Sequence, residues 1–354
     1  MFVNLGTEFS NRYLSLETAA AARKLVEQVM LVKPGENVVI SADTASDFRV
    51  VEATAQAVFA VGAQPVVIWY DTKANACQQP PAPIAKAVEV ADVWLEYSLA
   101  YIMHCESYRT ALKNGVRYAC LTGMDVEMLV KTLGKVNYGK LVALGEVIRR
   151  TVEAADEIHV TSPGGTDLVA ANQGRKVRQS GKLADTKGEA IMLGGQISWC
   201  PLEETINGKL VFDGALWPPM ELGLLSGPVI LTLEGGIVTK VEGGKDATIF
   251  ARWLENFNDP NMYRLAHYSL GFNPGVTKPT GRIVEDERVF GCIEMGIGSQ
   301  GPQIRGKTWA AASHSDGIVL NPSIYLDGEA MELNGKYVHP EIVAACQELG
   351  VQGY

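Results

Sequence analysis

The sequence predicts an α/β chain in which an open parallel α/β domain is followed by a β-rich α+β domain. Its length of 354 residues exceeds one usual domain core. Helical and strand patterns alternate up to about residue 165, and glycine-punctuated strand patterns dominate beyond it. The boundary is expected between about 165 and 195, which gives domains 1–170 and 171–354.

The first half repeats a cycle of helix and strand. Residues 15–30 combine helical spacing with strong helix formers, and PGENVVISAD then becomes a short β-rich run. Strands separated by helices of this length imply right-handed crossovers and a parallel sheet covered on both faces. The further helices are expected at 46–62, 83–91, 107–115, 126–133 and 140–155, and the further strands at 63–70, 92–98, 117–123 and 157–162.

The second half consists mainly of β-like runs. One helix, at 247–259, interrupts them, and the strings EGGI and LDGE are typical of hairpin turns. The runs lie at 208–214, 228–243, 266–272, 289–299, 314–320 and 323–338.

Composition excludes several classes of partner. The formal net charge of −9 offers no basic surface for nucleic acid. No apolar run reaches the roughly 20 residues that span a bilayer, so no membrane partner is expected. The opening stretch MFVNLGTEFSNRYLS lacks the basic start and apolar run of a signal peptide, and the six cysteines form no CxxC pair. We therefore expect a cytoplasmic protein with reduced thiols.

A Gly-x-Gly-x-x-Gly string runs from Gly296 through Gly298 to Gly301. In a dinucleotide site such a string follows a strand and opens a helix whose N-terminus receives the pyrophosphate. The residues that follow here, PQIRGKTW, have no helical period. The string therefore favours a glycine-rich loop leaving a strand.

The stretch ASHSDGIV places His314 two positions before Asp316. Because strand side chains alternate between faces, these two share a face and Ser315 points the other way. The spacing suits two ligands of one metal ion and argues against a Ser-His-Asp triad built from these neighbours. A simple hydrogen bond between His314 and Asp316 at a strand end is the alternative.

Two further ionisable residues, His267 and Glu294, each stand among apolar neighbours just before a glycine. A lone buried ionisable group is costly unless it is paired or bound to metal. With His314 and Asp316, His267 completes the two-histidine, one-carboxylate set that holds non-haem iron(II). Adding Glu294 and Glu204 would instead give enough ligands for a zinc or dinuclear hydrolytic site.

Two other candidates are weaker. Glu204 follows Glu203 after a proline, and adjacent glutamates are usually a solvated turn. His104 falls beyond the carboxyl end of an expected parallel strand, where open α/β sheets have their ligand crevices. It is equally compatible with a core or helix-cap role.

The order of PLEETING, AHYSLGFNPG, GRIVEDERVFGCIEMGIGSQG and HSDGIVLNPSIYLDG resembles the thermophilic metalloaminopeptidases of the aminopeptidase T type over about residues 195–330. The resemblance implies an aminopeptidase T-like fold with a metal-binding second domain. In those peptidases Glu204 matches a metal-binding glutamate. The positions of His267 and Glu294 carry glutamate and histidine there, the reverse of this sequence.

With this exchange the sequence resembles the 2,5-dihydroxypyridine 5,6-dioxygenase family. Its members are iron(II) ring-cleaving enzymes that share the fold of the peptidases. ENFNDPNMYRLAHYSLGF matches the run into the first histidine ligand, and HSD matches the His-x-Asp ligands. The resemblance implies that His267, His314 and Asp316 bind iron and that His104 lies near the substrate pocket. This sequence departs from the family near Ile191 or Met192, where a second pocket histidine is replaced, and at Glu294, whose equivalent in the family is not a carboxylate.

We therefore expect an iron(II)-dependent, extradiol-like dioxygenase that opens a hydroxylated pyridine or related electron-rich aromatic with O2. His104 would deprotonate or orient the substrate hydroxyl. Glu294 would be an additional ligand or an acid/base group beside the metal. The alternatives are an aminopeptidase-type hydrolase, with Glu204 and Glu294 around zinc or another divalent ion, and a binding protein with a structural metal. The resemblance also suggests a homodimer.

Overall fold

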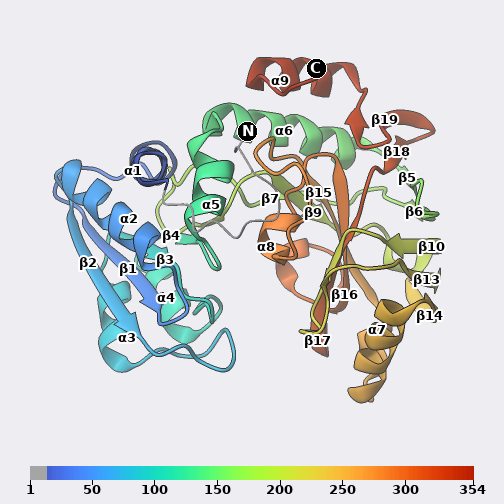
Figure 1. Ribbon diagram of the computed structural model, residues 1–354, viewed down its shortest axis with the longest axis horizontal. Coiled ribbons are helices and arrows are strands. Elements are labelled where there is room, and N and C mark those ends of the chain that lie inside the picture. The colour runs from blue at the N-terminus through green and yellow to red at the C-terminus, as the bar shows by residue number, and fades with distance from the viewer. Residues whose placement is uncertain (1–13) are drawn as a thin grey trace. The chain divides into compact units, whose positions relative to one another are not determined.

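The computed structural model describes residues 14–354 and confirms the mixed α/β class (Figure 1). The chain divides into two compact units. Unit 1 comprises Met1–Lys135 with Ala184–Ala190, and unit 2 comprises Val136–Leu183 with Ile191–Tyr354. Residues 1–13 lie outside the described residues, and they make up most of the opening stretch in which no signal peptide is expected.

The five-stranded sheet has the order β2-β1-β3-β4-β8, and its strands β1 to β4, which lie in unit 1, run parallel as expected. Six of the seven residues of β1 are buried, as a central strand with helices on it requires. The strands are β1 (Asn37–Asp43), β2 (Gln64–Tyr70), β3 (Val93–Glu96), β4 (Arg117–Cys120) and β8 (Ala190–Met192). The helices are α1 (Ser15–Lys24), its π-helical continuation η1 (Leu25–Val29), α2 (Phe48–Ala60), α3 (Ala82–Glu89), α4 (Glu106–Lys113), α5 (Val126–Leu129) and η2 (Val130–Gly134).

Local chemistry sets the ends of these helices. The Asp47 side chain accepts the backbone N–H of Arg49 at the start of α2, and the left-handed Gly62 follows its end. Asp125 caps α5 in the same way through the N–H of Met128. The sequence predicts these boundaries because both signals are local.

Unit 2 contains two antiparallel sheets. The eight-stranded sheet has the order β14 (Ile237–Gly243), β13 (Val229–Glu234), β10 (Asn207–Phe212), β6 (Asp167–Ala171), β5 (Glu157–Thr161), β18 (Ser323–Leu326), β19 (Glu329–Leu333) and β20 (Lys336–Tyr337). The seven-stranded sheet has the order β12 (Gly223–Leu224), β11 (Ala215–Trp217), β17 (Trp309–Val319), β16 (Cys292–Gln300), β15 (Leu265–Gly271), β9 (Gln196–Trp199) and β7 (Arg178–Gln179).

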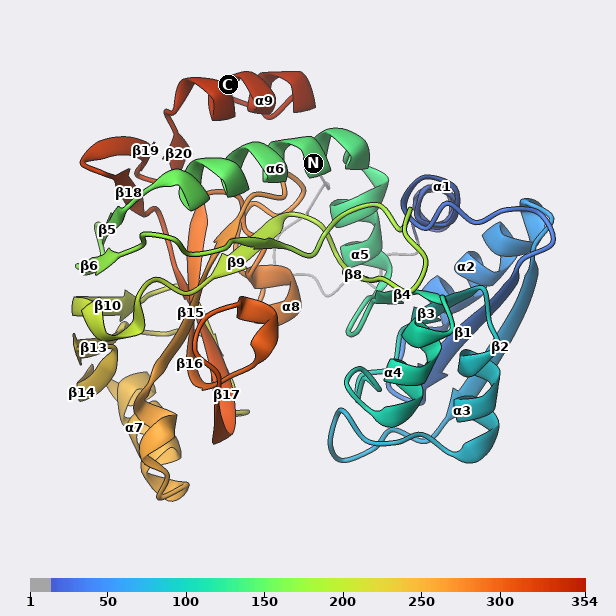
Figure 2. The same ribbon diagram turned by 180° about the vertical axis from the view of Figure 1, so that it is seen from behind.

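Helices border the sheets of unit 2. They are α6 (Tyr138–Ala154), α7 (Lys245–Asn256), α8 (Ile283–Asp286) and α9 (Pro340–Leu349), with the short turns η3 (Glu203–Thr205), η4 (Pro260–Tyr263) and η5 (Pro302–Ile304). Figures 1 and 2 both show α9 beside α6, where the Lys140 ammonium donates to the carbonyl of Glu348. No helix in residues 14–354 combines the length and apolar character needed to cross a bilayer.

The sequence-derived division after residue 170 falls inside unit 2. The helix and strand expected at 140–155 and 157–162 exist as α6 and β5, but β5 pairs antiparallel with β6 and β18 instead of joining the parallel sheet. Both hairpin signals correspond to turns with two left-handed residues, Gly235 with Gly236 and Asp327 with Gly328.

The seven-stranded sheet has two chemically different faces. One face carries buried apolar side chains such as Tyr268, Met295 and Ile297. It packs on the eight-stranded sheet, since a Cβ at Gly317 on this face would meet the Phe212 ring of β10 at 2.5 Å. The other face carries ionisable side chains, and α8 covers only one end of it, where Ile283 packs with Cys292 and Ile318.

Candidate metal centre

Three adjacent strands bring the predicted ligands together. In the ladder, His267 of β15 pairs with Gly296 of β16, and Gly296 pairs with Asp316 of β17. His314 stands one alternation further along β17, opposite Gly298. Strict alternation therefore places both histidines and the aspartate on the same face of the sheet.

The three side chains form the one His/Cys/Asp/Glu group in the described part of the chain that could hold a metal ion, with ligand atoms within 4.8 Å of one another. Asp316 Oδ1 lies 2.8 Å from His314 Nε2 and 3.6 Å from His267 Nε2. The two imidazoles stack at 5.1 Å between centroids with an interplanar angle of 10°. The donor set is two imidazoles and one carboxylate, which suits a divalent transition metal.

Gly296 makes this stacking possible. A Cβ at this position would lie 2.4 Å from Cε1 of His267 and 2.7 Å from Cε1 of His314. Both contacts are far shorter than van der Waals separation, so any larger residue would push the imidazoles apart. The glycine string was expected as a loop leaving a strand, but Gly296 and Gly298 lie within β16 and only Gly301 lies beyond its end. Gly296 leaves the space that the two rings occupy.

The hydrogen bonds of His314 test whether a metal fits. Its Nδ1 lies 2.7 Å from the carbonyl oxygen of Ser299, which can only accept, so Nδ1 carries the proton. In the neutral ring Nε2 is then a bare acceptor facing Asp316 Oδ1 at 2.8 Å. Two acceptors at this distance repel unless a proton or cation is shared between them. A backbone carbonyl that fixes the tautomer in this way is typical of metal-bound histidine.

Glu294 borders the cluster. It is fully buried, and its two carboxyl oxygens lie 3.1 and 3.2 Å from His267 Nε2. Oε1 has no hydrogen-bond partner among the described residues, and Oε2 accepts a long contact of 3.5 Å from Gln196. A buried carboxyl oxygen without a donor is costly, and a nearby cation would offset that cost. The donor set and this oxygen together fit a metal ion.

Burial and mutual charge set the protonation of the cluster. Burial lowers the pKa of His267, which favours the neutral ring that can bind metal. Burial opposes ionisation of Asp316, but the His314 imidazole prevails and lowers the pKa of the carboxyl to about 2. Burial lowers the pKa of His314, but the charge of Asp316 outweighs burial and raises it. Burial, and then the charge of Asp316, raise the pKa of Glu294 well above its usual range.

Ser315 lies on the opposite face, as alternation predicts. Its hydroxyl is directed to the carbonyl of Pro218 at 2.5 Å and is fully buried. It therefore cannot act with His314 as a nucleophile.

Glu204 does not join the cluster. Its side chain is 60% exposed and forms a surface ion pair with Lys307. The adjacent Glu203 is the buried one of the pair, where it accepts the N–H of Lys307 at 2.7 Å and pairs with Arg175. The structure thus gives no support to Glu204 as a ligand, and the expectation of a solvated turn fits Glu204 but not Glu203.

His104 belongs to unit 1. It follows β3 and precedes α4, as expected, and has a left-handed φ of 74°. Its carbonyl accepts from the Arg109 guanidinium, and its ring packs edge-on against Tyr108 at 5.7 Å between centroids.

The sequence matches the family NicX, described as 2,5-dihydroxypyridine 5,6-dioxygenase, over residues 20–339. The chain belongs to this family. The 2,5-dihydroxypyridine 5,6-dioxygenase of Pseudomonas putida KT2440 is 28% identical over 269 residues, which cover 72% of this chain and 73% of that protein.

Solved structures agree with the fold of this dioxygenase family. The structure of 2,5-dihydroxypyridine dioxygenase from Pseudomonas putida KT2440 matches 92% of this chain and 98% of its own, with a TM-score of 0.75 and 21% identity. AmpT from Thermus thermophilus matches 92% and 100%, with a TM-score of 0.66 and 16% identity. At these identities the likeness shows the fold, so the relation to the aminopeptidase is one of fold alone.

Membership of the dioxygenase family confirms the expectation of a ring-cleaving dioxygenase. Such an enzyme acts on a small aromatic molecule with O2 and implies a metal cofactor, for which the cluster of His267, His314 and Asp316 is the candidate site. Sequence reasoning missed Gly296 and the Ser299 carbonyl. The sequence shows the glycines, but their place between the two histidines follows only from the pairing of β15, β16 and β17.

Proposed function

We propose that this chain is an iron(II)-dependent dioxygenase that cleaves the ring of a hydroxylated pyridine or a close relative. The observation that carries the metal assignment is the two-histidine, one-aspartate set, in which the Ser299 carbonyl holds the Nδ1 proton of His314 and Nε2 faces Asp316 at 2.8 Å. The hydroxypyridine class is supported by the family and by the relative from Pseudomonas putida.

Iron(II) held by His267, His314 and Asp316 would supply open positions for a substrate oxygen and O2, and the electrons needed to bring them together. The protein contributes orientation. The Ser299 carbonyl keeps the proton of His314 on Nδ1 and so directs Nε2 into the site. The absence of a side chain at Gly296 lets the His267 and His314 rings stack on the same side of the sheet.

Glu294 is proposed as an acid/base group beside the metal. Burial raises the pKa of its carboxyl well above the usual range, which favours the protonated form that a general acid needs. Proton transfer would then need an acceptor within about 2.6–3.2 Å. The neighbouring His267 Nε2 at 3.1 Å shows that the carboxyl is directed toward the cluster. Direct ligation of the metal is the alternative role.

His104 is proposed to deprotonate or orient the substrate hydroxyl. The residue type suits this task because an imidazole titrates near neutral pH. Its place after the carboxyl end of β3, where open parallel sheets bind ligands, supports the proposal.

One experiment tests the proposed function. The protein is purified without air, its metal content is measured, and O2 uptake is followed with dihydroxypyridines and catechols beside hydrolysis of amino-acid anilides. We expect O2-dependent ring cleavage with iron(II) and no anilide hydrolysis. Hydrolysis without O2 uptake would replace the dioxygenase by the peptidase-type alternative, and neither activity in any metal form would favour a binding protein.

A further inference from the structure

The segment between β3 and α4, residues 97–105, is held by a buried carboxyl at its start. Glu96, the last residue of β3, is fully buried. Its Oε1 accepts the backbone N–H of Ile102 at 2.6 Å, and its Oε2 accepts the hydroxyl of Tyr118 from β4. One side chain therefore ties the segment to the sheet two residues before His104.

A second buried carboxyl anchors the middle of the segment. Asp43, the last residue of β1, accepts the N–H of Ala100 at 3.2 Å through Oδ2. The Ser46 hydroxyl lies 3.0 Å from both Asp43 Oδ1 and the carbonyl oxygen of Tyr97, and its single proton is shared between these two acceptors. The carboxyl ends of two neighbouring parallel strands thus bind the same segment at successive points.

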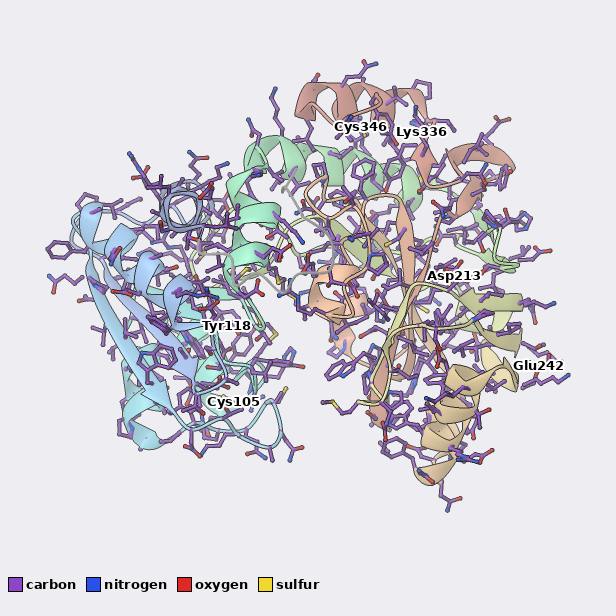
Figure 3. The ribbon with its side chains drawn as sticks, in the orientation of Figure 1. Cys105, Tyr118, Asp213, Glu242, Lys336 and Cys346 are labelled. Carbon is purple, nitrogen blue, oxygen red and sulfur yellow. The ribbon has the colours of Figure 1, made fainter. Side chains whose placement is uncertain are left out.

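A chain of aromatic rings leads from Glu96 to His104. The Tyr118 ring packs edge-on against Tyr108 at 5.1 Å, and Tyr108 packs edge-on against His104 at 5.7 Å. Figure 3 labels Tyr118 together with Cys105, the residue that caps α4. Because Glu96 receives the hydroxyl of Tyr118, it fixes the first ring of this chain as well as the backbone.

The backbone of His104 needs such support. Its φ of 74° is a left-handed conformation that a residue with a Cβ adopts only when its surroundings hold it there. The turn is closed by the N–H of Cys105, which donates to the carbonyl of Ile102 at 3.2 Å. Ile102 is the residue whose own N–H is bound by Glu96.

We propose that Glu96 and Tyr118 are positioning residues for His104: Glu96 fixes the turn that carries the imidazole, and Tyr118 fixes the ring on which the imidazole packs. The inference rests on the role proposed above for His104, but the positioning itself is a property of unit 1 that can be measured without substrate.

The test uses matched variants of the full-length protein. Glu96→Gln keeps the bond to Ile102, since the amide oxygen can accept its N–H, and replaces the bond from Tyr118 by one in which the amide nitrogen donates to the Tyr118 oxygen. Glu96→Ala removes both, and Tyr118→Phe removes only the hydroxyl while it keeps the packed ring. Burial raises the pKa of Glu96 to about 8, so the neutral glutamine also matches its protonation at neutral pH.

The first readout is the imidazole NMR spectrum. The chain has five histidines, so the His104 signals can be assigned by their loss in His104→Ala. We expect them unchanged in Glu96→Gln, shifted in Tyr118→Phe, and shifted and broadened in Glu96→Ala. If Glu96→Ala does not fold, Tyr118→Phe still decides. Unchanged His104 signals in every variant that folds would overturn the proposal.

The second readout is kcat with a dihydroxypyridine on the iron-loaded enzyme. Glu96→Ala should lower kcat about tenfold or more with little change in KM, as expected for a misplaced catalytic group. In the His104→Ala background, Glu96→Ala should lower kcat less than about twofold, because Glu96 acts on the reaction only through His104. If the losses of kcat caused by Glu96→Ala and His104→Ala multiplied in the double variant, positioning through His104 would be overturned. Full activity of His104→Ala would remove the role proposed for His104 in the reaction and leave the NMR result to decide its positioning.

Discussion

At the scale of single residues, the candidate metal centre depends on a missing side chain as much as on its three proposed ligands. The His267 and His314 imidazoles occupy the space that a Cβ of residue 296 would fill. The ligands could be proposed from residue type and alternation. The need for glycine between them could not, because it depends on how closely two rings from different strands approach.

Replacing Gly296 by alanine should therefore remove metal binding without unfolding the chain. A Cβ 2.4 Å from the His267 ring must displace it, and a shift of that size spoils a three-ligand site. We expect iron content, measured after anaerobic reconstitution, to fall about tenfold or more, as it does when groups that orient ligands are lost. Gly227→Ala is the control, because its Cβ would meet no atom within 4 Å. Full iron occupancy in Gly296→Ala would contradict the steric argument.

His267→Ala and His314→Ala should each abolish iron binding while the fold is kept. Either change leaves two protein ligands, too few for the proposed site. His159→Ala is a suitable control, since this histidine lies at the surface beside Asp167. The measurement is metal content together with far-UV circular dichroism. If either ligand variant kept full metal occupancy, the proposed ligand set would be wrong.

The Glu96 carboxyl should make stability depend on pH. Burial raises its pKa from 4.5 to about 8, so the folded protein retains a proton that the unfolded chain loses above pH 4.5. This contribution is fully present below pH 4.5 and is lost as pH rises through 8. Urea unfolding at several pH values should show wild type losing free energy of unfolding relative to Glu96→Gln, by roughly 1 kcal/mol per pH unit. Parallel pH profiles for the two proteins would show that Glu96 is not protonated in the fold.

At the scale of elements, the connection between β16 and β17 is fastened by Glu203. This carboxylate accepts the N–H of Lys307 and pairs with Arg175, and both partners of the ion pair are largely buried. At the end of the connection the Trp309 indole donates to the carbonyl of Gly298, and Arg264 covers the Trp309 ring at 4.3 Å. The hairpin that carries His314 is therefore closed by its own Trp309 together with Glu203 and Arg264 from outside it.

Adjacent glutamates offer a matched comparison at this connection. Glu203→Ala leaves the Arg175 guanidinium buried without its partner, so we expect it to lower the free energy of unfolding by about 3 kcal/mol. Glu204→Ala removes only an exposed ion pair and should cost less than about 0.5 kcal/mol. Urea denaturation of both variants checks this. Equal losses would mean that the burial of Glu203 is irrelevant to the hairpin.

Periodicity predicted most elements but not all of their partners. The helix at 140–155 and the strand at 157–162 have the same local patterns as the parallel α/β units before them. Only the antiparallel pairing of β5 with β6 and β18 assigns that strand to unit 2, and β18 lies more than 160 residues further along the chain. Pairing over such a separation leaves no local mark in the sequence.

At the scale of the whole molecule, the candidate ligands and the proposed positioning residues of His104 belong to different units. His267, His314 and Asp316 lie in unit 2, whereas His104 and Glu96 lie in unit 1. Residue types and a family resemblance could place each group on its own element. They could not show that the first segment of unit 1 ends at Lys135, because α6 packs in unit 2 despite its α/β-like sequence. A homodimer stays a prediction, which light scattering on the purified protein would check.

Metal binding should stabilise the two units unequally. A ligand that binds only the folded state, present at 100 times its dissociation constant, adds about 2.7 kcal/mol to stability. Because all three ligands lie in unit 2, iron(II) should slow hydrogen exchange in β15, β16 and β17 and leave β1 and β3 unchanged. His314→Ala should show no effect of the metal. Slower exchange throughout unit 1 as well would contradict a site confined to unit 2.

Because alternation brings the proposed ligands to one face, metal binding should depend on the correct register of β17 against β16. If β17 slipped by one residue against β16, Ser315 and Gly317 would take the places of His314 and Asp316, and both ligands would turn toward the eight-stranded sheet. A slip by any odd number of residues therefore removes both side chains from the donor set. Metal uptake measured during refolding should therefore report when β16 and β17 have paired in the native register.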